Sequence, residues 1–154
     1  MWSRYNIESL FLTAECLSAW LRVMIPEAAV PDADLQSAIR AAITGADQNT
    51  ALVDAARDRM MIQFLRRGEK PVDANKLARE AVRSDPATYQ RGHDRAAMVP
   101  GGIRRALPVG VQREVRATIA DLIGAAKRNA HVGQLEALIP AEIRELLAWI
   151  VGEP

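Results

Sequence analysis

Two histidines and one cysteine are the residues of this sequence best suited to ligating a metal or attacking a substrate. His93 is followed directly by Asp94, and both side chains could ligate a metal ion, but the only other histidine is His131. Two histidines do not complete the ligand sets of catalytic metals unless several carboxylates join them. We therefore expect no metal site and no cofactor.

Cys16 stands within an apolar run, where a thiol surrounded by apolar side chains is unreactive. A nucleophile also needs a base within hydrogen-bonding reach, and neither histidine is placed by the sequence beside a serine or the cysteine. We therefore expect a protein that is not an enzyme. A single cysteine cannot form an internal disulfide, which suits a reducing compartment.

The first 25 residues match neither a signal peptide nor a membrane-spanning helix. They lack the basic, apolar and small-residue regions of a signal peptide. Glu8, Glu15 and Arg22 interrupt the apolar run over 7–25, and a spanning helix tolerates few such charges. We expect a cytoplasmic protein with no membrane partner.

Arginine, which binds phosphate and carboxylate groups in bidentate fashion, is concentrated between residues 83 and 116. Seven arginines stand there against three acidic residues, whereas the whole chain carries a net charge of +1. An aromatic and a histidine side chain lie among them and could stack on a nucleic-acid base. We predict one exposed basic surface that contacts a partner; the alternative is a solvated connecting loop. The candidate binding residues are Tyr89, Arg91, His93, Arg95, Arg104 and Arg105.

The elements that must position these residues are helices. Apolar side chains recur with a 3.6-residue period on both sides of the arginine-rich segment, while residues 85–110 contain many prolines and glycines and no sustained period. We expect a long loop over 85–110, joining helical parts 1–84 and 111–154 of a single domain. The expected helices cover residues 7–25, 33–44, 51–67, 73–84, 111–128 and 140–151.

Short connections favour antiparallel neighbours, so the predicted fold is an all-α antiparallel bundle of five to seven helices. The helix over 7–25 is apolar around most of its circumference and needs cover on more than one side. It is expected to be the central core helix, with Phe11, Leu17, Trp20 and Leu21 buried. If it is not buried, a homodimer interface is the alternative.

The function expected first is that of a non-catalytic protein–protein interaction module: an adaptor, an inhibitor or an assembly subunit. Abundant arginine and alanine are typical of a GC-rich genome, and we expect a bacterial or bacteriophage source. The alternative is a helical protein that binds the nucleic-acid backbone through residues 83–116. It ranks second because net charge is near zero and aromatic residues make up only 5% of the chain.

Overall fold

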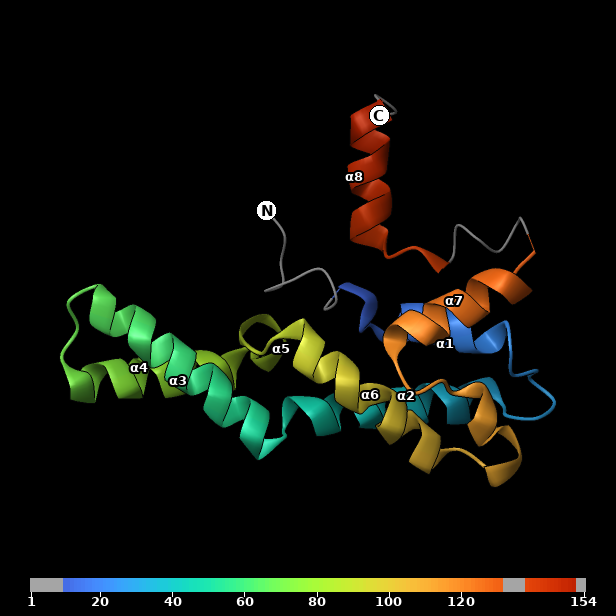
Figure 1. The fold of residues 1–154 in the computed structure, drawn as a ribbon, viewed down its shortest axis with the longest axis horizontal. Helices are drawn as coiled ribbons and strands as arrows, with labels where there is room; N and C mark the ends of the chain where they lie inside the picture. The colour runs from blue at the N-terminus through green and yellow to red at the C-terminus, as the bar shows by residue number, and fades with distance from the viewer. Residues whose placement is uncertain (1–9, 132–137, 152–154) are drawn as a thin grey trace.

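A computed structural model of the chain describes residues 10–131 and 138–151, and the regular elements within these ranges are all helical (Figure 1). The all-α prediction is confirmed. The described residues form eight α-helices and the 3₁₀ helix η2, where five to seven helices were expected. The elements are α1 (Ala14–Arg22), α2 (Asp32–Asp47), α3 (Thr50–Arg66), α4 (Pro71–Ser84), α5 (Pro86–Tyr89), α6 (Gly92–Ala106), η2 (Val109–Glu114), α7 (Ile119–Asn129) and α8 (Ala141–Val151).

Helix α1 contributes the largest side chains of the main core, which it builds together with α2, α6 and α7. Leu17, Trp20 and Leu21 are at most 1% exposed, and the half-buried Phe11 ring packs on Trp20 with the centroids 5.6 Å apart. The prediction of a core helix is confirmed for Leu17, Trp20 and Leu21, whereas Phe11, also expected to be buried, is half-buried and precedes the helix. Because the chain covers these side chains itself, they offer no exposed face of the kind that suggested a homodimer.

The start of α1 lies further along the chain than the sequence predicted. Thr13 is the N-cap: its Oγ1 accepts a hydrogen bond from the Cys16 N–H at 3.2 Å, which satisfies one of the donors left over at a helix start. The helix therefore begins at Ala14 rather than near Ile7. Residues 7–9 of the expected helix lie outside the described residues.

The long loop expected over 85–110 is wrong for most of its length, because residues 92–106 form α6. Glycine and proline disfavour a helix locally, but packing against α2 outweighs that preference. The buried residue Ile103 lies three positions after the buried Pro100 and four after the buried Val99, so it shares a face of the helix with each of them. That apolar face turns a proline-containing segment into a core helix.

Gly102 lets α6 approach α2 closely. A Cβ atom at this position would lie 2.8 Å from the Cβ and 3.2 Å from the Cα of Ala42. The two helices run in opposite directions side by side (Figure 1), and their contact depends on small residues at this crossing. The glycine that argued for a turn in the sequence is instead a packing residue.

Helices α3 and α4 form a hairpin that extends away from the core, to the left in Figure 1. Asn49 caps α3 by accepting a hydrogen bond from the Leu52 N–H at 3.2 Å. Gly68, at φ 93°, makes the turn into α4, a conformation that glycine adopts without strain. The fully buried side chains of the hairpin are small: Ala56, Ala74, Ala78 and Val82.

Several predicted boundaries need correction. Helix α4 starts with Pro71 at its first position rather than at the expected residue 73. Helix α2 continues through Gly45 to Asp47. The helix expected over 111–128 is divided into η2 and α7.

Helix α8 stands apart from the other helices, above the core in Figure 1. The chain just before it is anchored, because the Trp20 indole Nε1 donates a hydrogen bond to the Leu138 carbonyl at 2.8 Å. The apolar period of the expected helix over 140–151 indicates a buried face, but Leu147 and Ile150 on it are 49% and 62% exposed. In residues 10–131 and 138–151, no helix is long and apolar enough to cross a membrane.

Candidate functional site

The six predicted site residues lie at the two ends of α6 rather than on one surface. Tyr89, Arg91, His93 and Arg95 surround its N-terminal end, whereas Arg104 and Arg105 belong to its last turn. With a rise of about 1.5 Å per residue, Arg91 and Arg104 lie roughly 20 Å apart along the helix axis. The structure therefore does not bring the six residues into one continuous patch.

Arg95 is buried, which corrects the prediction that it lies on an exposed basic surface. Its Nε and Nη2 atoms lie 2.8 and 2.7 Å from the same carboxylate oxygen, Oδ1 of Asp47, and its side chain is 1% exposed. The charge is thus neutralised inside the protein. A buried arginine needs such a partner, since an unpaired buried charge is costly.

Gln90 also contacts Asp47, and the sequence did not indicate it as a site residue. Its Nε2 donates a hydrogen bond to the Asp47 backbone carbonyl at 2.7 Å, and its side chain is almost fully buried. Asp47, Gln90 and Arg95, which we call the Asp47 cluster, link the end of α2 to the start of α6. The cluster fixes the junction from which the α3–α4 hairpin departs.

Arg104 is also occupied within the chain. Its Nε and Nη2 atoms donate hydrogen bonds to the Val115 carbonyl at 3.2 and 2.6 Å. The guanidinium group thereby ties the end of α6 to the segment between η2 and α7. Two of the four predicted arginines therefore have structural contacts, and only Arg91 and Arg105 are exposed as predicted.

The two predicted stacking residues differ in exposure. His93 is exposed on the first turn of α6, whereas Tyr89 is half-buried at the end of α5. The Tyr89 carbonyl accepts a hydrogen bond from Nη2 of Arg59 at 3.5 Å, the limit of such a contact. Tyr89, Arg91 and His93 therefore lie together at one end of α6, and this group is smaller than the basic surface that the sequence predicted.

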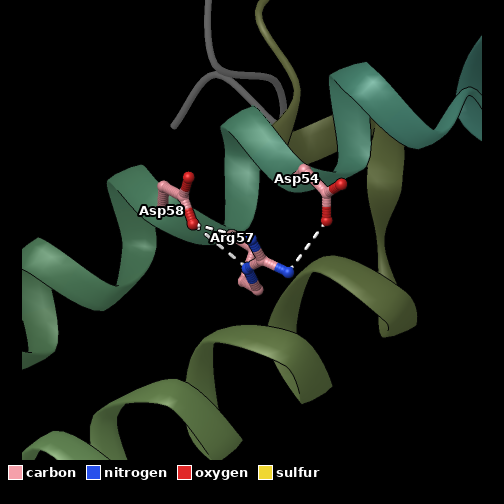
Figure 2. Close-up of polar contacts among 3 residues, drawn as sticks. All are labelled: Asp54, Arg57 and Asp58. Atoms are coloured by element: carbon pink, nitrogen blue, oxygen red, sulfur yellow. Dashed lines mark hydrogen bonds and ion pairs between the residues drawn. The ribbon is translucent and has the colours of Figure 1, made fainter.

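A second charged cluster lies on α3, at the base of the hairpin. Figure 2 shows Arg57 between two aspartates: its Nη1 is 2.8 Å from Asp54 Oδ1, and its Nη2 is 2.9 Å from Asp58 Oδ1. The hydrogen bond to Asp58 raises the pKa of the Arg57 guanidinium, and the negative charge of Asp54 adds to the effect. Arg57 is thus the centre of an ion-pair group on the surface of α3.

Helix α8 carries the largest exposed apolar side chains near one another in the sequence. Leu147 is 49% exposed, Trp149 78% and Ile150 62%. Leu147 and Ile150 lie on one side of the helix, and Trp149 lies about 100° from Ile150 around the helix axis. We call these three residues together the α8 apolar face. The sequence contained the signal, an apolar helix period over 140–151, but the period does not say whether another part of the chain covers that face.

Within the described residues, no group of three or more histidine, cysteine, aspartate or glutamate side chains could hold a metal ion. Comparison with known proteins adds no relative: no protein-family model, no curated protein and no solved structure matches this chain. Its function must therefore be argued from its own residues.

Proposed function

We propose that this protein is a non-catalytic protein–protein interaction module whose α8 inserts its apolar face into an apolar groove on a partner protein. The observation that carries the proposal is the exposure of Leu147, Trp149 and Ile150 on a helix that stands apart from the core. Apolar side chains of this size are normally buried, and when they gather on a surface they mark an interaction site.

The spacing of the anchors supports a helix-in-groove complex. Ile143, Leu147 and Ile150 lie at positions i, i+4 and i+7, the pattern by which an amphipathic helix enters a groove. Trp149 lies about 100° from Ile150 around the helix axis, where its large aromatic surface would contact the rim of such a groove. Tryptophan is enriched among residues that dominate binding energy. The predicted partner surface is therefore apolar and concave.

The remaining helices serve in this proposal as an antiparallel-bundle scaffold that presents α8. Trp20 connects the two parts, since its indole holds the Leu138 carbonyl at 2.8 Å. A fixed base lowers the orientational freedom that α8 loses on binding, and so raises affinity.

The test is to capture the partner from the native host and to measure its affinity for purified variants. Trp149→Ala should weaken binding by about 30-fold or more, the effect of losing one dominant anchor. Val72→Ala is the matched control, because Val72 is also exposed, at 81%, but lies on the hairpin. Equal affinity of Trp149→Ala and the unaltered protein would refute the proposal.

Sedimentation of the purified protein shows whether the α8 apolar face binds another protein or a second copy of this chain. A monomer that binds another protein supports the groove complex proposed above. A dimer that Trp149→Ala dissociates would show that the partner is a second copy of this chain, and the proposed heterologous groove would then be wrong.

Nucleic-acid-backbone binding through residues 83–116 ranks below this proposal. Arg91 and Arg105 are exposed, as are Arg113 and Arg116 from the same segment, but Arg95 and Arg104 are held by internal contacts. Backbone binding would show as an affinity for DNA that falls linearly in a log–log plot against salt concentration. An absence of DNA binding at low salt would eliminate this alternative.

A further inference from the structure

A hollow of about 450 Å³ lies where the first turn of α1 meets α2 and α6. Its polar lining comes from all three helices, and its apolar wall includes the buried Leu12 and the half-buried Ile43. The polar residues that line it are Thr13, Glu15, Arg40, Thr44, Asp47 and Arg95.

We propose that this hollow binds a small molecule through an oxyanion group, a carboxylate or a phosphate. The site is separate from the α8 apolar face, and it gives the protein a ligand beyond the partner proposed above. Three independent features of the hollow support it: an unpaired buried donor, a helix N-terminus and a cation at the rim.

The unpaired donor is Nη1 of Arg95. Nε and Nη2 of this guanidinium both bind Oδ1 of Asp47, while Nη1 is buried without a hydrogen-bond partner among the residues that the structure describes. Buried donors in native proteins almost always have an acceptor, because leaving one unpaired is costly. Since Arg95 lines the hollow, an acceptor on a ligand there would complete its hydrogen bonds.

The helix N-terminus is that of α1. Thr13 satisfies one of the N–H groups left over at the helix start, that of Cys16, through Oγ1; its carbonyl accepts the first bond of the helix itself, from the Leu17 N–H. The N–H groups of Ala14 and Glu15 come before the first hydrogen bond that a helix makes internally. Such groups, together with the positive end of the helix dipole, favour an oxyanion.

The lining of the hollow carries two positive and two negative side chains, so the attraction of an anion depends on where each charge lies. The Asp47 carboxylate is paired with Arg95 inside the protein, so these two charges largely cancel. Arg40 and Glu15 are both exposed at the rim, and of these only Arg40 attracts an anion. The hollow is larger than one phosphate ion, and its apolar wall suits the body of a small organic acid or phosphate ester.

The experiment is a titration of the full chain with inorganic phosphate and, separately, with acetate, at constant ionic strength maintained with chloride. Backbone amides and the Arg95 Nε–H are followed by ¹H–¹⁵N NMR. The expected result is a saturable shift of the Ala14 and Glu15 amides and of the Arg95 Nε–H. Saturation by phosphate alone identifies a phosphate site, and saturation by acetate alone identifies a carboxylate site.

Arg40→Gln is the decisive variant, because the side chain is exposed and its loss leaves the core intact. It should weaken anion binding by roughly fivefold to tenfold, as expected for one charge-assisted hydrogen bond. Arg66→Gln removes the same charge from an exposed position on α3 and should leave the affinity unchanged. Shifts that do not saturate, or that fall equally in both variants, would overturn the proposal.

Discussion

The core around α1 and the α3–α4 hairpin are both helical, but they bury side chains of different size. In the core, Leu17 and Trp20 are at most 1% exposed. In the hairpin the fully buried residues are alanines and Val82, while large side chains such as Met60 and Phe64 remain half-buried. Because hydrophobic stabilisation grows with the apolar area buried, most of it resides in the core.

Helical content and stability are therefore distributed differently in this chain. The hairpin helices are 17 and 14 residues long, longer than the nine of α1, yet α1 supplies much more buried volume. Segments with few buried apolar contacts open at a lower free-energy cost than the core of the same protein. Matched substitutions inside and outside the core make this contrast measurable.

The largest difference in stability is expected between two variants that each remove the carboxylate of an ion pair, one in the core and one on the hairpin. Asp47→Ala leaves the 1%-exposed Arg95 side chain without its counter-charge and should lower the free energy of unfolding by about 3–5 kcal/mol. Asp54→Ala removes an ion pair of Arg57 on the surface of α3, where the carboxylate is 49% exposed, and should leave the urea midpoint nearly unchanged. Similar losses in the two variants would contradict the assignment of Asp47 to the core.

The next largest difference in stability is expected between leucine-to-alanine substitutions in the core and in the hairpin. Leu17→Ala removes a fully buried side chain of α1 and should cost about 2–5 kcal/mol. Leu65→Ala affects a side chain that is 37% exposed near the end of α3 and should cost about 1 kcal/mol or less. Urea denaturation measures both, and a small cost at Leu17 would show that α1 is not the centre of the core.

Two glycines in helices provide the smallest and most specific comparison. Gly102→Ala places a Cβ 2.8 Å from that of Ala42 and should cost about 1–3 kcal/mol through overpacking. Gly45→Ala adds a Cβ with no atom within 4 Å and should raise stability by about 0.4–1 kcal/mol, because alanine loses less entropy on forming a helix. A stabilising Gly102→Ala would show that α2 and α6 do not approach as closely as described.

The sequence predicted those features that depend on residues close together in the chain, such as the positions of most helices. The apolar run of α1 and the start of α3 within one residue of the expected position 51 were recognised because periodicity and capping act over a few residues. Helix α6 was missed because glycine and proline mark a turn locally, and only the distant surface of α2 reverses that preference.

The arginines of the candidate site also show that contacts between residues far apart in the sequence were not predicted. Counting charge between residues 83 and 116 could not reveal that Arg95 meets Asp47, which is 48 positions away. The expected end of α2 at Thr44 also placed Asp47 in a loop rather than on the helix that faces α6. For α8, periodicity predicted the helix, but no sequence pattern states whether another segment covers it.

The hydrogen bond from Gln90 to Asp47 holds the two ends of the hairpin segment together, so the hairpin resembles an insertion between α2 and α6. Because the Gln90 side chain reaches the Asp47 carbonyl at 2.7 Å, residues 48–89 leave the core and return to it at neighbouring points. Excursions whose ends lie close together are the places where chains accept added or exchanged modules. The core helices α2 and α6 would remain neighbours if a short turn replaced the hairpin, so the chain can be regarded as a small core that carries an arm.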